Sequence, residues 1–174
     1  MGLRAVLAEV RALEEARVVE RYAIGGAVGA LRYVSVGATE DVDVFVTFAS
    51  ESGGRLDPLA PIYEFLKPRG ARVEAGRLVI GGWPVQFLPA DGPLLQEAMG
   101  EALDVDVEGT PTRVFTAEHL AAIALQLGRP KDKLRVVQMV DEKVLDMKRF
   151  AAILKRHGLT AKWETFSRTI LGGT

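Results

Sequence analysis

The sequence contains no cysteine and only two histidines, His119 and His157. Without cysteine the chain forms no disulfide, offers no thiol nucleophile and binds no metal through thiolates. Two histidines alone do not build a typical zinc site, and we expect both to lie at the surface or at helix ends. The lack of cysteine fits a reducing compartment, so we expect a cytoplasmic protein.

Long apolar runs and an excess of one charge are also missing. The N-terminal segment carries charged residues every few positions, which excludes the unbroken apolar stretch of a signal peptide. No run approaches the roughly 20 apolar residues of a membrane-spanning helix, so we expect a soluble protein with no membrane partner. The formal net charge is −1, so no global positive field attracts nucleic acid or an anionic membrane.

What the sequence does contain is the composition of a globular protein. Its 174 residues are 48% hydrophobic and 26% charged, which allows a substantial buried core. This length suits one domain, or a sheet domain with a helical appendix. We expect an α+β core over residues 1–115 and a helical region over residues 116–174.

The first of these regions alternates between helical and extended patterns. Apolar residues at helical spacing, with glycine or proline at several helix starts, predict helices at 3–17, 27–34, 57–67 and 93–103. Runs of β-branched and aromatic residues, separated by glycine turns, predict strands at 21–24 and 42–48, a meander over 71–88, and a hairpin from 104–108 and 112–115. Together they predict a mixed, mostly antiparallel sheet flanked by helices.

The last third reads as helical to near its end. Thr116 supplies a capping hydroxyl before the apolar run LAAIALQL. Breaks at glycine and aspartate positions predict helices at 117–127, 130–142, 146–157 and 160–170.

The most informative chemistry lies in a glycine pair followed by an acid pair. Asp41 and Asp43 have one residue between them, so on a strand their side chains point to the same face, with Cα atoms about 6.5–7 Å apart. Two acids on an otherwise Val and Phe strand are costly unless a cation neutralises them, and magnesium favours carboxylate and phosphate oxygens. Gly25 and Gly26 come before a helix, where backbone N–H groups can approach a phosphate.

This combination resembles the signature of the nucleotidyltransferase superfamily. The signature is a hydrophobic residue with Gly-Gly or Gly-Ser, a spacer, and Asp-x-Asp or Asp-x-Glu on a strand. Here it reads IGG, fourteen residues, then DVDV, with Thr39 two residues before the first acid, where the family often has Thr or Ser. The likeness covers residues 20–160 and is sharpest at 24–46.

The resemblance implies a magnesium-dependent nucleotidyltransferase. Such an enzyme transfers a nucleoside monophosphate from a nucleoside triphosphate to an acceptor, here an unknown protein, RNA or small molecule. By this resemblance, Asp41 and Asp43 are catalytic and bind one or two magnesium ions. Gly25, Gly26 and Thr39 are implied to contact the nucleotide.

The helical tail adds a second, looser resemblance. It is similar to the tails of bacterial minimal nucleotidyltransferases related to toxin–antitoxin and abortive-infection proteins. Those tails often carry an Arg-x-Lys-Asp step, which here is RPKD at 129–132. The resemblance implies that Lys131 reaches the nucleotide, and that the partners include a toxin–antitoxin protein.

Two positions depart from the family pattern. The segment PVQFLPA resembles the strand that carries a third carboxylate in the family, and Gln86 stands at that position. The third acid helps to bind the catalytic metal and activates the attacking hydroxyl, so Gln86 is assigned a weakened form of this role. Glu74, Asp104 and Asp106 are candidates to replace it. Gly37 occupies the other position, where relatives often carry an arginine.

Plainer interpretations of the same residues stay open. Asp41 and Asp43 would face solvent if their strand lay at a sheet edge, paired with Arg32 or Arg113, and the glycines would then form an ordinary turn. The basic stretch is either a solvated helix start, paired with nearby acids, or a cluster that reaches a triphosphate or an RNA; it comprises Arg129, Lys131, Lys133 and Arg135. The alternative function is a catalytically weak or inactive nucleotidyltransferase-like binding module, such as a toxin–antitoxin component or a nucleotide sensor.

Overall fold

The computed structural model describes residues 2–35, 41–49 and 57–172. Helices and strands alternate up to residue 114, and helices follow. In chain order the elements are α1 (Leu3–Glu15), β1 (Arg21–Ile24), α2 (Gly26–Ala30), β2 (Val42–Thr47), α3 (Ala60–Leu66), a 3-10 turn (Lys67–Arg69), β3 (Arg72–Glu74), β4 (Arg77–Ile80), β5 (Trp83–Pro89), α4 (Pro93–Gly100), β6 (Leu103–Val107), β7 (Thr110–Val114), α5 (Ala117–Leu127), α6 (Pro130–Asp141), α7 (Met147–Arg156) and α8 (Thr160–Ile170).

The strands form one mixed sheet in the order β3-β4-β5-β2-β1-β7-β6. Most neighbours are antiparallel, while β2 pairs with β5, and β1 with β7, in parallel. The predicted α+β fold with a mixed, mostly antiparallel sheet is therefore confirmed. Because β2 lies between β1 and β5, it is an interior strand, as its run of Val and Phe predicts.

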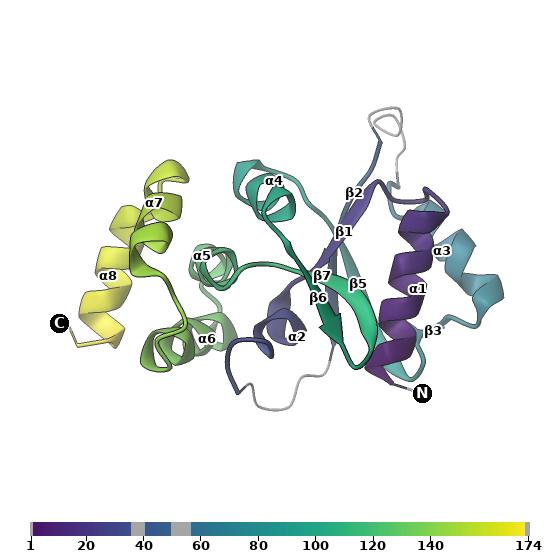
Figure 1. The fold of residues 1–174 in the computed structure, drawn as a ribbon, viewed down its shortest axis with the longest axis horizontal. Coiled ribbons are helices and arrows are strands. Elements are labelled where there is room, and N and C mark those ends of the chain that lie inside the picture. Colours follow the sequence, from purple (N-terminus) through teal and green to yellow (C-terminus); the bar gives the residue numbers. More distant parts are fainter. Residues whose placement is uncertain (1, 36–40, 50–56, 173–174) are drawn as a thin grey trace.

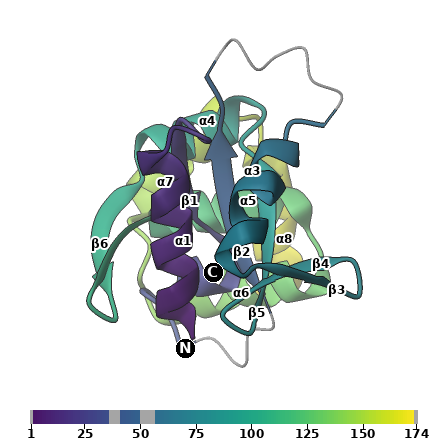
Figure 2. The ribbon, with the colours of Figure 1, turned by 90° about the vertical axis from the view of Figure 1, so that its right-hand side faces the viewer.

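Helices cover both faces of this sheet. In Figure 1, α1 and α3 lie on the right of the sheet, and the helices from α5 onward lie on the left. Figure 2 shows α1 and α3 side by side in front of the strands. Side chains of β2 point alternately to the two faces of the sheet. Val42, Val44 and Val46 belong to the apolar cluster under α1 and α3, whereas Phe45 belongs to the cluster on the other face.

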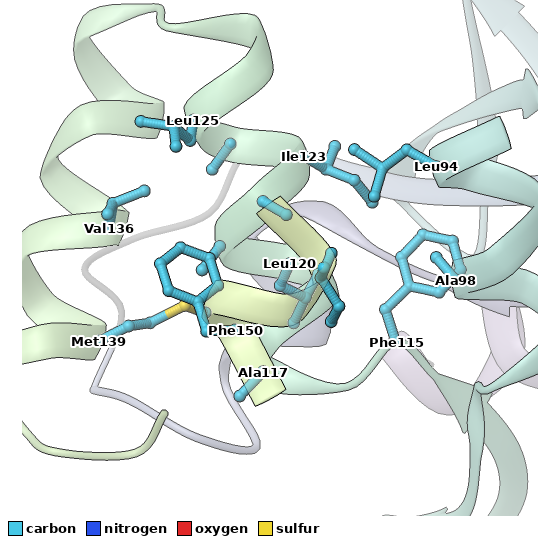
Figure 3. Close-up of a cluster of buried hydrophobic side chains, with 14 of the residues drawn as sticks. Leu94, Ala98, Phe115, Ala117, Leu120, Ile123, Leu125, Val136, Met139 and Phe150 are labelled. Atoms are coloured by element: carbon cyan, nitrogen blue, oxygen red, sulfur yellow. The ribbon is translucent and has the colours of Figure 1, made fainter. Parts of the chain in front are cut away.

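Helix α5 is the centre of the second apolar cluster. It contacts α2 and α4 on the sheet side and α6, α7 and α8 on the other. Figure 3 shows Ile123 of α5 beside Leu94 of α4, with Met139 and Phe150 packed around the opposite side of the same helix. Such an all-round apolar helix has to be buried, and every residue of α5 from Ala117 to Leu125 is buried.

Several element boundaries differ from the sequence prediction, among them those of three helices. Helix α2 ends at Ala30 rather than at 34, and the hydroxyl of Tyr33 in the following turn donates to the carbonyl of Phe115. Helix α3 begins later than predicted, at Ala60, although Asp57 accepts a hydrogen bond from the backbone N–H of Leu59, as expected of a capping residue. Helix α4 ends at Gly100, which leaves residue 103 to start β6.

Within residues 2–35, 41–49 and 57–172, no helix has the length and apolarity needed to cross a membrane. The loop expected at 51–55 lies outside the described residues.

Candidate functional site

A cleft of about 630 Å³ lies on the sheet face that α5 and α6 cover. Its floor is formed by β2 and β5, and its walls by the start of α2, by α4, and by the facing sides of α5 and α6. The lining contains both polar and apolar residues; the polar ones include Asp41, Asp43, Gln86, Arg77, Arg129, Lys131, Asp132, Arg135 and Gln138. The cleft is therefore the place where the chemistry-bearing residues of the sequence meet.

The two aspartates come together in this cleft, as the spacing predicts. Asp43 is on β2, Asp41 comes one residue before it begins, and both line the cleft. Burial raises the pKa of the Asp43 carboxyl, and the charge of Asp41 raises it further. The interior place of β2 excludes the edge-strand alternative, and Arg113 instead pairs with Glu14 and Asp104.

The glycine pair lies directly against the acid pair. A Cβ atom built on Gly26, whose φ is +56°, would lie 1.9 Å from Oδ2 of Asp43. A Cβ atom on Gly25 would lie 2.4 Å from the Phe45 ring, and the N–H of Gly25 donates to the carbonyl of Asp43 at 3.0 Å. Only glycine fits at either position, so the helix start and the carboxylates are held in contact.

Gln86 lies beside Asp43 on the neighbouring strand. The two are register partners in the parallel pair of β2 and β5, so their side chains share the cleft face. Gln86 is exposed within the cleft. Its position is the one for which the family resemblance implies a third carboxylate. Gln86 carries a neutral amide there.

The structure excludes the three candidate substitutes for that carboxylate. Glu74 lies on β3 and Asp104 and Asp106 on β6, the two edge strands, each three strands away from β2. None of the three lines the cleft. Within the described ranges, no group of three or more His, Cys, Asp or Glu side chains has the geometry of a metal site.

A basic wall on α6 faces the aspartates across the cleft. The charges of Lys131, Arg135 and Arg129 lower the pKa of Asp43, which they could not do from a solvated position far from it. All three residues line the cleft, whereas Lys133 does not. Arg129 and Lys131 are nevertheless exposed, and Arg129 pairs with Asp132 as the solvated-helix interpretation expects, whereas the Arg135 side chain is only 12% exposed.

Asp132 is a residue of the cleft to which the sequence interpretation gave no role in the site. The Asp132 side chain is 1% exposed and pairs with Nε of Arg129 at 2.6 Å and Nη1 of Arg135 at 3.5 Å. Its spacing of three residues to each arginine is the only signal in the sequence, since residues three apart share a helix face. Thr39 and Gly37 lie outside the described residues, so their predicted roles stay predictions.

Apolar residues also line the cleft. They include Leu88, Leu95, Ile123 and Leu127, from β5, α4 and α5. Leu127 is 53% exposed, although it is a large apolar residue. The cleft therefore combines charged groups, suited to a metal and phosphates, with apolar surface suited to the flat or uncharged part of a ligand.

The two histidines lie outside this cleft. His119 lies at a helix end, in the first turn of α5, but it is fully buried there, and its Nδ1 hydrogen-bonds the hydroxyl of Thr116 at 2.8 Å. Its Nε2 and that of His157 contact the two carboxylate oxygens of Glu97, at 3.2 Å and 2.7 Å. Arg156 pairs with the same carboxylate, so the histidines belong to a structural cluster.

Comparison with known proteins matches the fold but not the sequence. No protein-family model and no curated protein matches the chain. Its fold is similar to the solution structure of the antibiotic-resistance factor ANT(2'')-Ia, with a TM-score of 0.56 and 14% identity over 95% of this chain and 96% of that one. A crystal structure of ANT(2'')-Ia in complex with adenylyl-2''-tobramycin gives a TM-score of 0.52 and 18% identity, over 90% and 99% of the two chains.

A third similar structure is an antigenic nucleotidyltransferase-like protein from Paracoccidioides brasiliensis. It has a TM-score of 0.52 and 15% identity, and the match covers 93% of this chain and 92% of that one. The three matches span nearly the whole chain, and each is to a nucleotidyltransferase or a protein described as like one. The chain has the nucleotidyltransferase fold.

Proposed function

We propose that the protein is a magnesium-dependent nucleotidyltransferase. It transfers a nucleoside monophosphate from a nucleoside triphosphate to the hydroxyl of an acceptor and releases pyrophosphate. The observation that carries this proposal is the contact between Gly26 and Asp43, where a Cβ atom would lie 1.9 Å from the carboxylate. It supports a phosphate-binding backbone and a metal-binding carboxylate acting on the same ligand.

The acid pair fits a hard divalent cation. Burial and the neighbouring charge of Asp41 raise the pKa of Asp43, and a cation shared by the two carboxylates would relieve both penalties. Magnesium is commonly held by one or two carboxylates together with substrate phosphates. When bound, it supplies positive charge that aligns the triphosphate and stabilises the charge developing on the leaving group.

The residues around the acid pair have separate tasks in this proposal. The backbone at Gly25 and Gly26 lies against the β- and γ-phosphates, with the N–H of Gly26 as the donor because that of Gly25 already donates to Asp43, and Lys131 neutralises their charge from the α6 side. The acceptor oxygen forms a bond to the α-phosphorus while the bond to the bridging oxygen of the β-phosphate breaks, and pyrophosphate leaves with that electron pair. Gln86 accepts a hydrogen bond from the attacking hydroxyl, whose proton passes to water because an amide is not basic enough to take it.

The acceptor is the least specified part. The ANT(2'')-Ia complex contains adenylyl-2''-tobramycin, a small molecule that carries an adenylyl group, so a small-molecule acceptor is one class to test. Protein and RNA acceptors are the others. The apolar residues of the cleft lining offer a surface for the uncharged part of an acceptor or for a nucleobase; they include Leu88, Leu95 and Leu127.

Ligand-dependent thermal melting tests the binding half of the proposal. A triphosphate present at about 100 times its Kd stabilises the folded protein by about 2.7 kcal/mol, so ATP or CTP with magnesium should raise the melting temperature. Asp43→Asn should abolish the shift. Asp141→Asn, an exposed change at the end of α6, is the matched control and should retain it. A shift that persists in Asp43→Asn, or in the absence of magnesium, would contradict the proposal.

Incubation with labelled triphosphates and a cell lysate tests the transfer half. We expect label on a protein, an RNA or a small molecule, in the wild type but not in Asp41→Asn. If the wild type binds the triphosphate and labels nothing, the proposed transfer is wrong.

The neutral side chain of Gln86 favours one alternative, a nucleotide-binding module without turnover. Such a module would be a nucleotide sensor or one half of a toxin–antitoxin pair. Its signature is a magnesium-dependent melting shift with no labelled product. Gln86→Asp would then distinguish the two functions, because gain of labelling in this variant would show that only the third carboxylate was missing.

A further inference from the structure

The charged residues of the cleft lining suit one metal ion better than two, because few are acidic and several are basic. Asp41 and Asp43 are the metal-binding carboxylates of the described lining, and Gln86 takes the third place without a charge. Asp132, the remaining acid of that lining, is already paired with two arginines. Two magnesium ions would therefore have only these two carboxylates to share. Each ion would then depend on water and phosphate oxygens for most of its ligands.

One of the cations that line the cleft, Arg135, is largely buried. The side chain of Arg135 is 12% exposed, and its Nε atom is buried with no hydrogen-bond partner. A buried donor without a partner is costly and indicates that a ligand or water belongs beside it. The charges of Asp43 and Asp41 both act on Arg135, so its guanidinium lies within electrostatic reach of the acid pair.

Asp132 explains how these arginines keep their places. Its Oδ2 accepts from Nε of Arg129 at 2.6 Å, and its Oδ1 accepts from Nη2 of Arg129 at 3.2 Å and lies 3.5 Å from Nη1 of Arg135. Arg129 is the N-cap of α6, and Asp132 and Arg135 follow it at spacings of three. A fully buried carboxylate shared by two guanidiniums pre-organises both, which lowers the entropy lost when they bind an anion.

We propose that this site binds its triphosphate with a single metal ion, and that Arg135, positioned by Asp132, supplies the positive charge that a second metal ion would otherwise bring. The inference rests on the proposed binding of a magnesium–triphosphate complex. The single metal ion is held by Asp41 and Asp43, and the Arg135 guanidinium donates to phosphate oxygens on the opposite side through its terminal nitrogens. An arginine suits this place because it stays charged even when partly buried.

Counting bound manganese tests the proposal directly. The protein is saturated with a triphosphate analogue that has a methylene bridge between the α- and β-phosphorus atoms, and bound Mn²⁺ is counted by electron paramagnetic resonance. We expect one Mn²⁺ per wild-type chain and two per Gln86→Asp chain, because that variant restores a carboxylate beside Asp43. Two ions per wild-type chain would overturn the inference but leave the proposed function intact. Failure of the wild type to bind the analogue would overturn both.

Matched variants on α6 test the part played by the arginine. Arg135→Gln should weaken binding of the analogue at least about tenfold, as expected for loss of a charge-assisted contact. Lys133→Gln, an equal change two residues away and outside the cleft, should alter it less than about twofold. Equal affinities in the two variants would overturn the inference. If Arg135→Gln does not fold, Arg135→Lys replaces it, and the manganese count of the wild type decides.

Asp132→Asn separates positioning from stability. If Asp132 positions the arginines, this variant should bind the analogue several-fold more weakly while still taking one Mn²⁺. A purely structural Asp132 would change the melting temperature and leave the affinity of the folded protein unaltered, and this result would contradict its positioning role.

Discussion

Two carboxylates of this protein, Asp43 and Glu97, each face several basic side chains, yet their pKa values move in opposite directions. Hydrogen bonds from Arg156, and also from His157 and His119, lower the pKa of Glu97 from its ordinary value of 4.5 to about 2, against the effect of its burial. Burial and Asp41 raise the pKa of Asp43, and the cations of α6 only reduce this effect.

The opposite pKa shifts distinguish a cluster that stabilises the fold, around Glu97, from one that is suited to bind a ligand, around Asp43. Glu97 is contacted by donors from α5 and from the C-terminal end of α7, so it ties α4 to these two helices. Its hydrogen-bonding partners are all in the protein. Asp43 instead sits beside a second acid, and this arrangement gains stability only when a cation binds.

The substitution with the largest expected effect adds a methyl group at Gly26, between the backbone of the glycine pair and the Asp43 carboxylate. Gly26→Ala puts a Cβ atom 1.9 Å from Asp43 Oδ2 at a residue with a φ of +56°. We expect a loss of about 2–4 kcal/mol in the free energy of unfolding, and no triphosphate binding. Gly76→Ala is the control, because its φ is also positive but nothing lies within 4 Å of the new atom. Urea unfolding measures both, and equal costs would show that the contact with Asp43 is not tight.

Removing the charge of Glu97 should destabilise the fold by a smaller amount. Glu97→Gln leaves Arg156, His157 and the buried His119 with a weaker acceptor, so we expect a loss of about 1–3 kcal/mol in urea unfolding. Glu164→Gln, an exposed change on α8, serves as the control. A variant as stable as the wild type would mean that the Glu97 cluster does not hold α4 to α7.

The same cluster predicts how stability depends on pH. Glu97 has a lower pKa in the folded state, so its stabilising contribution is present above pH 4.5 and is lost as the pH falls from 4.5 toward 2. Burial lowers the pKa of His119 below 6.5, so the unfolded chain takes up a proton first and stability also falls as the pH drops below 6.5. Urea unfolding from about pH 7 to about pH 3 should show both losses. In Glu97→Gln the loss below pH 4.5 should disappear.

Removing a charge from the aspartate site should have the smallest effect, and the opposite sign. Asp43→Asn relieves the repulsion from Asp41 without changing the shape of the side chain, so we expect a gain on the order of 1 kcal/mol in metal-free protein. Thermal melting in the presence of a chelator measures it. A clear loss of stability would place Asp43 with Glu97 among the structural carboxylates.

The sequence predicts the aspartate half of the cleft because its signals are local. Gly25 and Gly26 lie in one short motif, and the spacing of Asp41 and Asp43 determines their common face once β2 is recognised as a strand. The position of Gln86 follows only from the family resemblance of its segment, since no local pattern shows that β5 pairs with β2. Strand order, however, depends on long-range pairing, so the sequence could not place Glu74, Asp104 and Asp106 at the sheet edges.

The helical half of the site was less predictable for a related reason. Asp132 and Arg135 resemble the charges of any solvated helix, and only the packing of α6 against α5 makes one of them buried and the other nearly so. The cluster around Glu97 joins residues up to 60 positions apart. No local pattern connects His119 to His157, so their shared partner emerges only from the arrangement of α4, α5 and α7.

The central claim is that one ligand touches the acid pair and the glycine pair together. Crystals soaked with manganese and a non-hydrolysable triphosphate, with anomalous scattering recorded for manganese, test it most directly. We predict a manganese peak between the carboxylates of Asp41 and Asp43, with the β- and γ-phosphates against the backbone of Gly25 and Gly26. Manganese bound elsewhere, or phosphates away from the glycines, would contradict the account.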